Sequence, residues 1–162
     1  MNQIKIPCEA FTFFFKPSIR VIFDWGRMER EKWPIELMLI DDLDSISSWY
    51  MPWNFDENKK EVNYQLPNAR PIQLQDVPCL LPEFDSKRRR LIHEFTKIFG
   101  KSSKPIQIAA PTYSLGNDTC FFLDGNHRMA ALMIARIPFR LLAFTVYGPL
   151  DGKIVPEFRH WE

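Results

Sequence analysis

The chain has 162 residues, of which 46% are hydrophobic and 14% aromatic, and its 21 basic and 20 acidic side chains leave a formal net charge of +1. A chain of this length and composition can bury a sizeable hydrophobic core, which excludes a disordered protein. The balanced charge excludes a protein that coats nucleic acid through an overall positive surface. The cysteines Cys8, Cys79 and Cys120 are widely spaced and odd in number, so we expect reduced thiols and neither a disulfide framework nor a zinc site.

The apolar stretches are too short to span a membrane. Those at 11–15 and 141–147 fall far below the roughly 18 residues that a transmembrane helix needs. The N-terminal residues lack the basic start, the long apolar run and the small-residue cleavage site of a secretory signal. We therefore expect a cytoplasmic protein without membrane contacts.

The charges are distributed unevenly along the chain. Residues 1–69 carry 8 basic and 11 acidic side chains, residues 70–147 carry 11 and 6, and residues 148–162 carry 2 and 3. These boundaries predict an N-terminal extension, a basic domain and a C-terminal tail. The contrast in charge between the first two parts predicts two functional surfaces.

The extension formed by residues 1–69 is predicted to be rich in β-structure and to pack against the domain. Aromatic and β-branched residues at 11–15 and 19–25 flank Lys16-Pro17-Ser18, a pattern that predicts two strands joined by a tight turn. The apolar run at 35–40 predicts a third strand. The acidic residues that follow it predict a turn or the start of a short helix.

Residues 49–69 show no clear hydrophobic period and predict an ordered, irregular segment. The aromatic side chains in this segment either pack the extension onto the domain or form a platform on which bases stack, and packing is the more general role. They are Trp49, Tyr50, Trp53 and Phe55.

Two helices are predicted in the basic domain. Asp85 is placed to cap a helix that ends near Gly100, because the apolar residues between them recur with the 3.6-residue period of one helix face. The Ala- and Leu-rich segment 130–136 predicts a second helix, which Pro138 brings to an end.

Strands are predicted around these helices. The runs at 106–108 and 120–123 predict short strands on either side of a Gly116-Asn117-Asp118 turn. The β-branched and aromatic content of 139–147 predicts a core strand.

The junction between a predicted strand and the second helix holds the run Asp124-Gly125-Asn126-His127-Arg128. A helix start offers free backbone N–H groups and the positive end of the helix dipole, which stabilise a phosphate or a carboxylate. Gly125 allows the backbone to approach such a ligand closely. Arg128 adds a fork of donors, and His127 can move a proton or donate a hydrogen bond near neutral pH.

Asp124 has several roles open to it. Its carboxylate can orient His127 or Arg128, hold a metal ion such as Mg²⁺, act as a base, or cap the helix. His127 and Arg128 also have structural alternatives, a packed imidazole and an ion pair. The presence of all three at one junction favours ligand binding over these alternatives.

The residues of this junction resemble a known signature. Residues 124–131 resemble the Asp-Gly-x-His-Arg-x-x-Ala motif of the ParB/sulfiredoxin superfamily, also called ParB-like nuclease domains. Residues 71–77 resemble its opening strand and turn, residues 104–108 its Pro-Ile-x-Val strand, and residues 139–146 its closing strand. The resemblance covers about residues 70–147 and implies an α+β fold, a small mixed sheet with two helices.

The resemblance also implies a function for the junction. Gly125, Asn126, His127 and Arg128 would bind a nucleotide or phosphate, with a nucleoside triphosphate and Mg²⁺ as the implied ligands. Asp124 would hold the Mg²⁺, and Asp124 and His127 would support NTP hydrolysis or phosphoryl transfer.

Departures from the family pattern reduce the number of activities that the resemblance implies. A sulfiredoxin has a cysteine where this chain has Asn126, which argues against sulfinic acid reduction. The motif also differs from the Gly-Glu-Arg-Arg type of partition proteins, and 15 residues follow Tyr147, so we expect no attached helix-turn-helix domain. The catalytic glutamate of a serine kinase has no clear counterpart, and Glu83 and Glu94 are candidates.

Two alternatives stand beside nucleotide binding. The acidic, aromatic extension, with Asp41, Asp42 and Asp44 in its turn, is typical of a non-catalytic protein that binds a basic partner, as an immunity protein or inhibitor does. The run Lys87-Arg88-Arg89-Arg90 is most simply a solvated helix face, but it also suits the phosphates of DNA, for binding or for metal-dependent cleavage.

Overall fold

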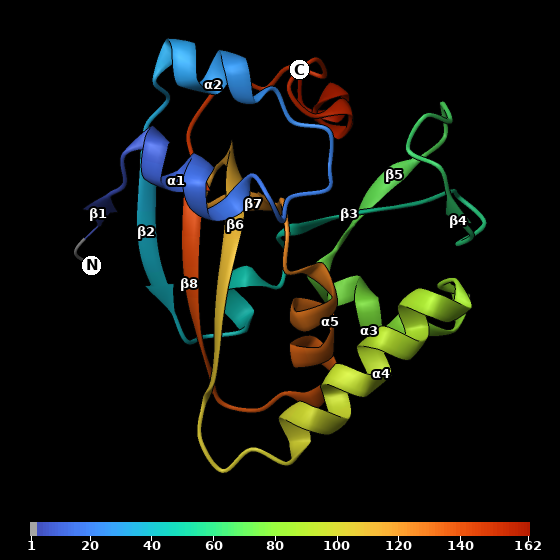
Figure 1. Ribbon diagram of the computed structural model, residues 1–162. Helices are drawn as coiled ribbons and strands as arrows, with labels where there is room; N and C mark the ends of the chain where they lie inside the picture. The colour runs from blue at the N-terminus through green and yellow to red at the C-terminus, as the bar shows by residue number, and fades with distance from the viewer. Residues whose placement is uncertain (1–2) are drawn as a thin grey trace.

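A computed structural model of the chain describes residues 3–162 and shows a mixed α/β fold with one eight-stranded sheet and five helices (Figure 1). The strands are β1 (Ile4–Lys5), β2 (Ile35–Ile40), β3 (Tyr50–Phe55), β4 (Glu61–Val62), β5 (Arg70–Gln73), β6 (Ile106–Gly116), β7 (Thr119–Phe122) and β8 (Phe139–Val146). The α-helices are α1 (Cys8–Phe15), α2 (Trp25–Glu31), α3 (Val77–Leu80), α4 (Ser86–Gly100) and α5 (Asn126–Ala135). The short 3-10 helices are η1 (Asp44–Ile46), η2 (Leu74–Asp76), η3 (Leu81–Glu83) and η4 (Pro156–His160). None of the helices within the described residues combines the length and apolar character that a membrane crossing requires.

The sheet is mixed, with the strand order β1-β2-β8-β6-β7-β3-β4 and with β5 paired to β3. β6 and β8 run parallel along a register from Ile106 opposite Phe139 to Tyr113 opposite Val146, and β3 runs parallel to β7. The chain leaves β6 through the antiparallel hairpin with β7, and α5 then carries it back to β8. This connection places the first turn of α5 directly after β7.

Strands from residues 1–69 lie on both sides of the central β8-β6-β7 group. The predicted extension is therefore continuous with the sheet of residues 70–147, because β2 pairs with β8 and β3 pairs with β7. Its contribution to the fold is made through backbone hydrogen bonds as well as through side-chain packing.

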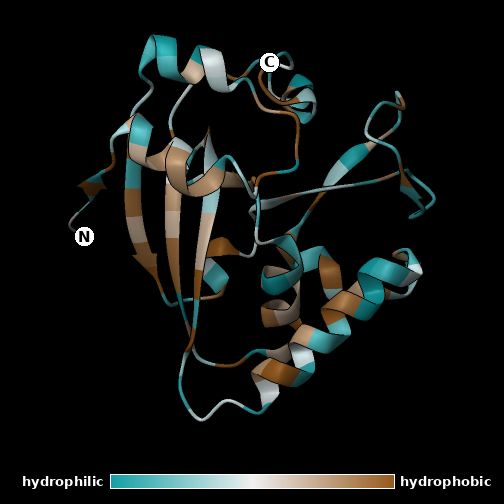
Figure 2. Cartoon of the chain, in the orientation of Figure 1, coloured by the Kyte–Doolittle hydropathy of each residue, from teal (hydrophilic) through white to brown (hydrophobic). Residues whose placement is uncertain are grey.

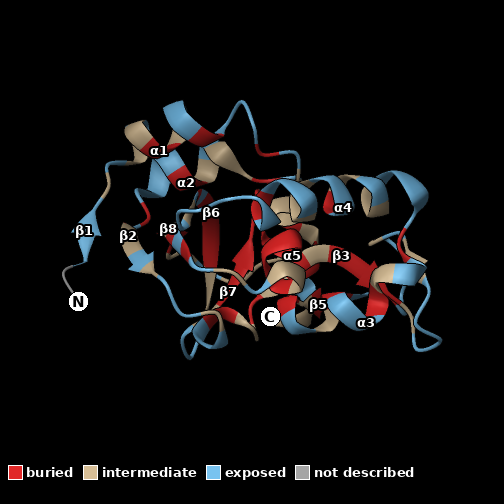
Figure 3. Ribbon diagram, turned by 90° about the horizontal axis from the view of Figure 1, so that it is seen from below, coloured by how far each residue is buried: buried red, intermediate tan, exposed pale blue. Residues whose placement is uncertain are grey.

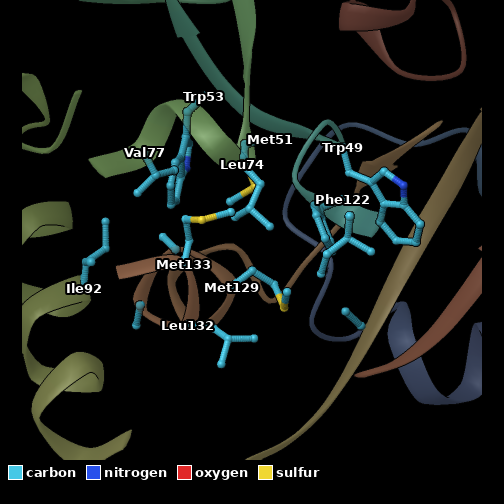
Figure 4. Close-up of a cluster of buried hydrophobic side chains, with 14 of the residues drawn as sticks. Trp49, Met51, Trp53, Leu74, Val77, Ile92, Phe122, Met129, Leu132 and Met133 are labelled. Atoms are coloured by element: carbon cyan, nitrogen blue, oxygen red, sulfur yellow. The ribbon is translucent and has the colours of Figure 1, made fainter. Parts of the chain in front are cut away.

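Side chains of the central strands alternate between two hydrophobic cores. In β7, Cys120 and Phe122 belong to a core shared with α3, α4 and α5, whereas Phe121 belongs to a second core shared with α1, α2 and η4. Figure 2 shows how apolar the central strands are, and Figure 3 shows their burial. In the first core, Met133 of α5 points toward the side chains of β3, including Trp53 (Figure 4). The period of two thus gives each face of the sheet its own helical cover.

Capping residues and backbone conformation set the ends of α4 and α5. The Asp85 carboxylate accepts a hydrogen bond of 2.9 Å from the backbone N–H of Arg88, which confirms the predicted cap of α4. α5 follows Gly125 and ends before Arg136, whose left-handed backbone (φ 48°) lies two residues ahead of Pro138. The predicted second helix is therefore confirmed, with its start four residues earlier than the segment 130–136.

Two of the strands predicted in the extension are wrong. Residues 11–15 belong to α1, in which Phe11 and Phe15 lie four residues apart on one buried face while Phe13 is 78% exposed. This spacing is that of a helix and not that of a strand. Residues 19–24 are irregular, and the Asp24 carboxylate accepts a hydrogen bond from the N–H of Arg27 to start α2.

The irregular segment predicted at 49–69 is wrong in part, because it contains β3 and β4. Trp49, Trp53 and Phe55 are buried in the first core, so their predicted packing role is confirmed. β3 was not predicted because Pro52 lies within its alternating apolar run, and a proline at such a place argues against a strand.

The other predicted elements are confirmed, except that the strand predicted at 106–108 extends to Gly116 as β6. The strand at 35–40 is β2, the acidic residues after it lead into η1, and the strand at 139–147 is β8. The hairpin between β6 and β7 turns at Asn117 and Asp118, whose positive φ angles of 50° and 57° match the expected tight turn.

Candidate functional site

A cavity of about 770 Å³ lies where the end of β7 and the first turn of α5 meet β3, the start of α4, the segment between α1 and α2, and η4. These elements come from distant parts of the chain, as Figure 1 shows. The polar lining comprises Arg20, Arg88, Asp124, Asn126, His127 and Glu157, together with Ser18 and Tyr64. Apolar side chains such as Val21, Ile22 and Leu91 line the rest. The volume is in the range of roughly 300–1,000 Å³ that is usual for small-molecule sites.

The junction between β7 and α5 leaves the start of the helix available to a ligand. Gly125 precedes the helix with a left-handed backbone (φ 80°), and no side chain caps α5. The alternative in which Asp124 is a helix cap is therefore wrong, and Asp124 lines the cavity instead. The side-chain Oδ1 of Asn126 is buried without a hydrogen-bond partner among the described residues. The first turn thus presents uncapped N–H groups and an unsatisfied side chain beside the cavity.

His127 lies in this first turn, with its ring centroid 5.2 Å from that of Trp53. Burial lowers the pKa of His127 below its ordinary value, and the charge of Arg88 lowers it further, whereas Asp85 and Asp124 act in the opposite direction. The imidazole is therefore neutral at neutral pH. It keeps one nitrogen that can accept a proton and one that can donate a hydrogen bond.

Arg88 reaches the cavity from the first turn of α4. Its Nη1 forms ion pairs with Glu61 and, at 3.2 Å, with Asp85, and its guanidinium carbon lies 4.8 Å from the ring centroid of Trp53. Burial lowers the pKa of Arg88, which nevertheless stays charged because an arginine begins near 12.5. Its Nε is buried without a hydrogen-bond partner among the described residues, so the ion pairs leave donors of this guanidinium uncommitted.

The predicted basic run is divided among different environments. Lys87 and Arg90 are exposed on α4, Arg89 donates a hydrogen bond of 2.9 Å to the backbone oxygen of Pro82, and Arg88 lines the cavity. The four side chains therefore do not present one continuous face. DNA binding by this run stays a prediction, and Lys87 and Arg90 are the two members exposed to solvent.

Two charged side chains of the lining were not identified as site residues from the sequence. Arg20 follows the buried Ile19 in the segment between α1 and α2, and Glu157 lies in η4 near the C-terminus. Neither residue has a motif around it, and both reach the cavity only through the packing of their segments on the second core. Glu157 is 6% exposed, and burial raises its pKa, an effect that is partly offset by its own backbone N–H, by the Asn54 side chain and by the charge of Arg159.

The remaining candidate residues lie outside the cavity lining. Gly125 and Arg128 do not line it, and Nη2 of Arg128 lies 3.3 Å from the position of a Cβ atom at Gly125. Glu83 and Glu94 are exposed and do not line the cavity. No group of three or more His, Cys, Asp or Glu side chains suited to a metal ion occurs within residues 3–162.

The acidic turn of the extension lies on a different surface. Asp41, Asp42 and Asp44 are exposed. At the start of η1, the Asp42 carboxylate accepts a hydrogen bond from the N–H of Asp44, and its backbone oxygen accepts one from the Ser45 hydroxyl. These bonds give Asp42 a structural role. A protein partner for this surface stays a prediction.

No model of a known protein family, no curated protein and no solved structure matches this chain. The resemblance of residues 124–131 to the ParB/sulfiredoxin signature therefore stays a prediction.

Proposed function

We propose that the protein binds a nucleotide in the cavity, with the phosphates at the start of α5. The observation that carries this proposal is the meeting of Arg20, Arg88 and the uncapped first turn of α5 around one cavity. Two guanidinium groups and free backbone N–H groups are the donors that bind phosphate most strongly in proteins. The volume of the cavity and its apolar lining leave room for the rest of the nucleotide.

Phosphoryl chemistry would involve the two titratable groups of the junction. The neutral imidazole of His127 is suited to accept a proton from an attacking water or hydroxyl group. Asp124 is the carboxylate beside the phosphate donors, and it would hold Mg²⁺ together with phosphate oxygens and water, since Mg²⁺ in such sites needs only one or two protein carboxylates. NTP hydrolysis or phosphoryl transfer is the reaction class that this arrangement supports.

Binding is tested first, by thermal shift and calorimetry with ATP, CTP, GTP and UTP, each with and without Mg²⁺. A ligand that binds only the folded protein raises its melting temperature by mass action. Arg20→Ala is the most direct variant, because Arg20 is exposed and forms no ion pair among the described residues. We expect it to weaken binding by roughly tenfold or more, the usual value of a charge-assisted hydrogen bond.

The matched control is Arg90→Ala, which removes an exposed arginine of α4 outside the cavity. It should leave affinity unchanged. Arg128→Ala distinguishes the two grounds for phosphate binding. The resemblance implies that Arg128 binds the phosphates, whereas Arg128 does not line the cavity. Absence of binding by all four nucleotides would refute the proposal. If one of them binds, release of inorganic phosphate by the parent protein and by His127→Gln then measures the reaction.

A further inference from the structure

Glu157 is the one charged side chain that is buried among the residues that the structure describes, and it lines the cavity. η4 presents it from the C-terminal part of the chain, apart from the phosphate donors on α4 and α5. A carboxylate repels phosphate, so the proposed phosphate site gives Glu157 no role. Its burial is costly unless the carboxylate is hydrogen-bonded.

The protein satisfies this carboxylate only in part. No described lysine or arginine forms an ion pair with it, and the guanidinium of Arg159 is occupied by the backbone oxygens of Tyr64 and Leu66, at 2.6 and 3.0 Å. The backbone N–H of Glu157 itself and the side-chain amide of Asn54 are the donors that act on the carboxylate. A carboxylate has about four acceptor positions, so acceptor capacity is left for a group inside the cavity.

We propose that Glu157 accepts hydrogen bonds from the ribose hydroxyls of the bound nucleotide and thereby selects ribonucleotides over 2′-deoxyribonucleotides. This inference rests on the proposed function, since it requires a nucleotide in the cavity. Two neighbouring hydroxyl groups match the two oxygens of one carboxylate, and acidic side chains bind the ribose of dinucleotides in this way. The cavity then divides its polar groups by chemistry, with Arg20 and Arg88 for phosphates and Glu157 for the sugar.

The test compares each of ATP, CTP, GTP and UTP with its 2′-deoxy counterpart by calorimetry in the presence of Mg²⁺. For the nucleotide that binds, we expect the parent protein to prefer the ribose form by roughly tenfold or more, as for a hydrogen bond to a charged group. Glu157→Gln keeps the shape of the side chain and removes one acceptor, and Glu157→Met removes both. Each variant should lower the affinity for the ribose form more than that for the deoxy form, which lacks the 2′-hydroxyl and keeps only the 3′-hydroxyl as a partner for Glu157.

Glu83→Gln is the matched control, because Glu83 is an exposed glutamate of η3 outside the cavity and the ribose preference should persist in it. Three results would overturn the inference alone: equal affinity of the parent for both forms, a preference that survives both Glu157 variants, or an equal loss of affinity for both forms. Binding of no nucleotide would overturn the proposed function and this inference together. Melting temperatures verify folding, and Glu157→Gln serves if Glu157→Met does not fold.

Discussion

Gly125→Ala tests the backbone geometry on which the cavity depends. Gly125 has a φ of 80° immediately before α5, and this left-handed conformation costs an alanine about 1–2 kcal/mol. A Cβ atom at this position would lie 3.3 Å from Nη2 of Arg128 and 3.5 Å from Cβ of Ala110. The first contact is with the end of a flexible side chain and the second is an ordinary van der Waals distance. Backbone strain therefore dominates, and we expect a loss of about 1–2 kcal/mol in the free energy of unfolding.

Urea denaturation measures this loss, and thermal unfolding should show a fall of about 2–8 °C in melting temperature for a chain of this length. Gly100→Ala is the matched control. Gly100 is the last residue of α4, it has no positive φ, and a Cβ there would meet no atom within 4 Å. It should gain roughly 0.5 kcal/mol, because alanine loses less conformational entropy on folding. Equal stability of Gly125→Ala and the parent protein would refute the requirement for glycine at this left-handed position.

Three further predictions concern the residues around the cavity. Asp85→Ala should reduce the free energy of unfolding by about 1 kcal/mol by removing the cap of α4, and Asp85→Asn, which caps equally well, should retain most of it in the same urea assay. The lowered pKa of His127 means that its contribution to stability is present above its ordinary pKa of 6.5 and is lost as the pH falls below that value. The melting temperature should therefore fall as the pH is lowered from 8 to 5, a window chosen about that value. It should fall less steeply in His127→Gln. Part of the fall should remain in this variant, because the pKa of His160 is also lowered. The pKa of Glu157 is raised, so its contribution is present below the ordinary pKa of 4.5 and is lost as the pH rises through the raised value. In the absence of nucleotide, Glu157→Gln should therefore gain stability relative to the parent at neutral pH but not in acid, and an equal effect at both would contradict this sign.

The helices of the basic domain could be predicted because their signals are local. Asp85 caps α4 by accepting a hydrogen bond from a backbone N–H three residues away. Pro138 prevents α5 from continuing past Arg136, two residues before it. The hairpin at Asn117 and Asp118 is local as well. In each case the residues that form the feature are close together in the sequence, so the sequence pattern alone predicts the interaction.

The aromatic segment at 11–15 shows where local signals fail. Five consecutive residues with strong β-propensity form a helix, because Phe11 and Phe15 bury their side chains against the second core and that burial outweighs propensity. β3 was missed for a different reason. Met51, Trp53 and Phe55 alternate toward the first core, but Pro52 within this run argues against a strand.

The candidate site also combines residues that local sequence predicts with residues that it does not. The sequence by itself determined that residues 124–128 stand at a strand-to-helix junction suited to an anion, because the start of a helix is a local structure. Only the tertiary structure decided which side chains share the cavity: Arg88 turned inward onto Trp53, Arg20 brought by the segment between α1 and α2, and Glu157 brought by η4. These residues meet through long-range packing on the two faces of one sheet, and no short stretch of sequence carries that information.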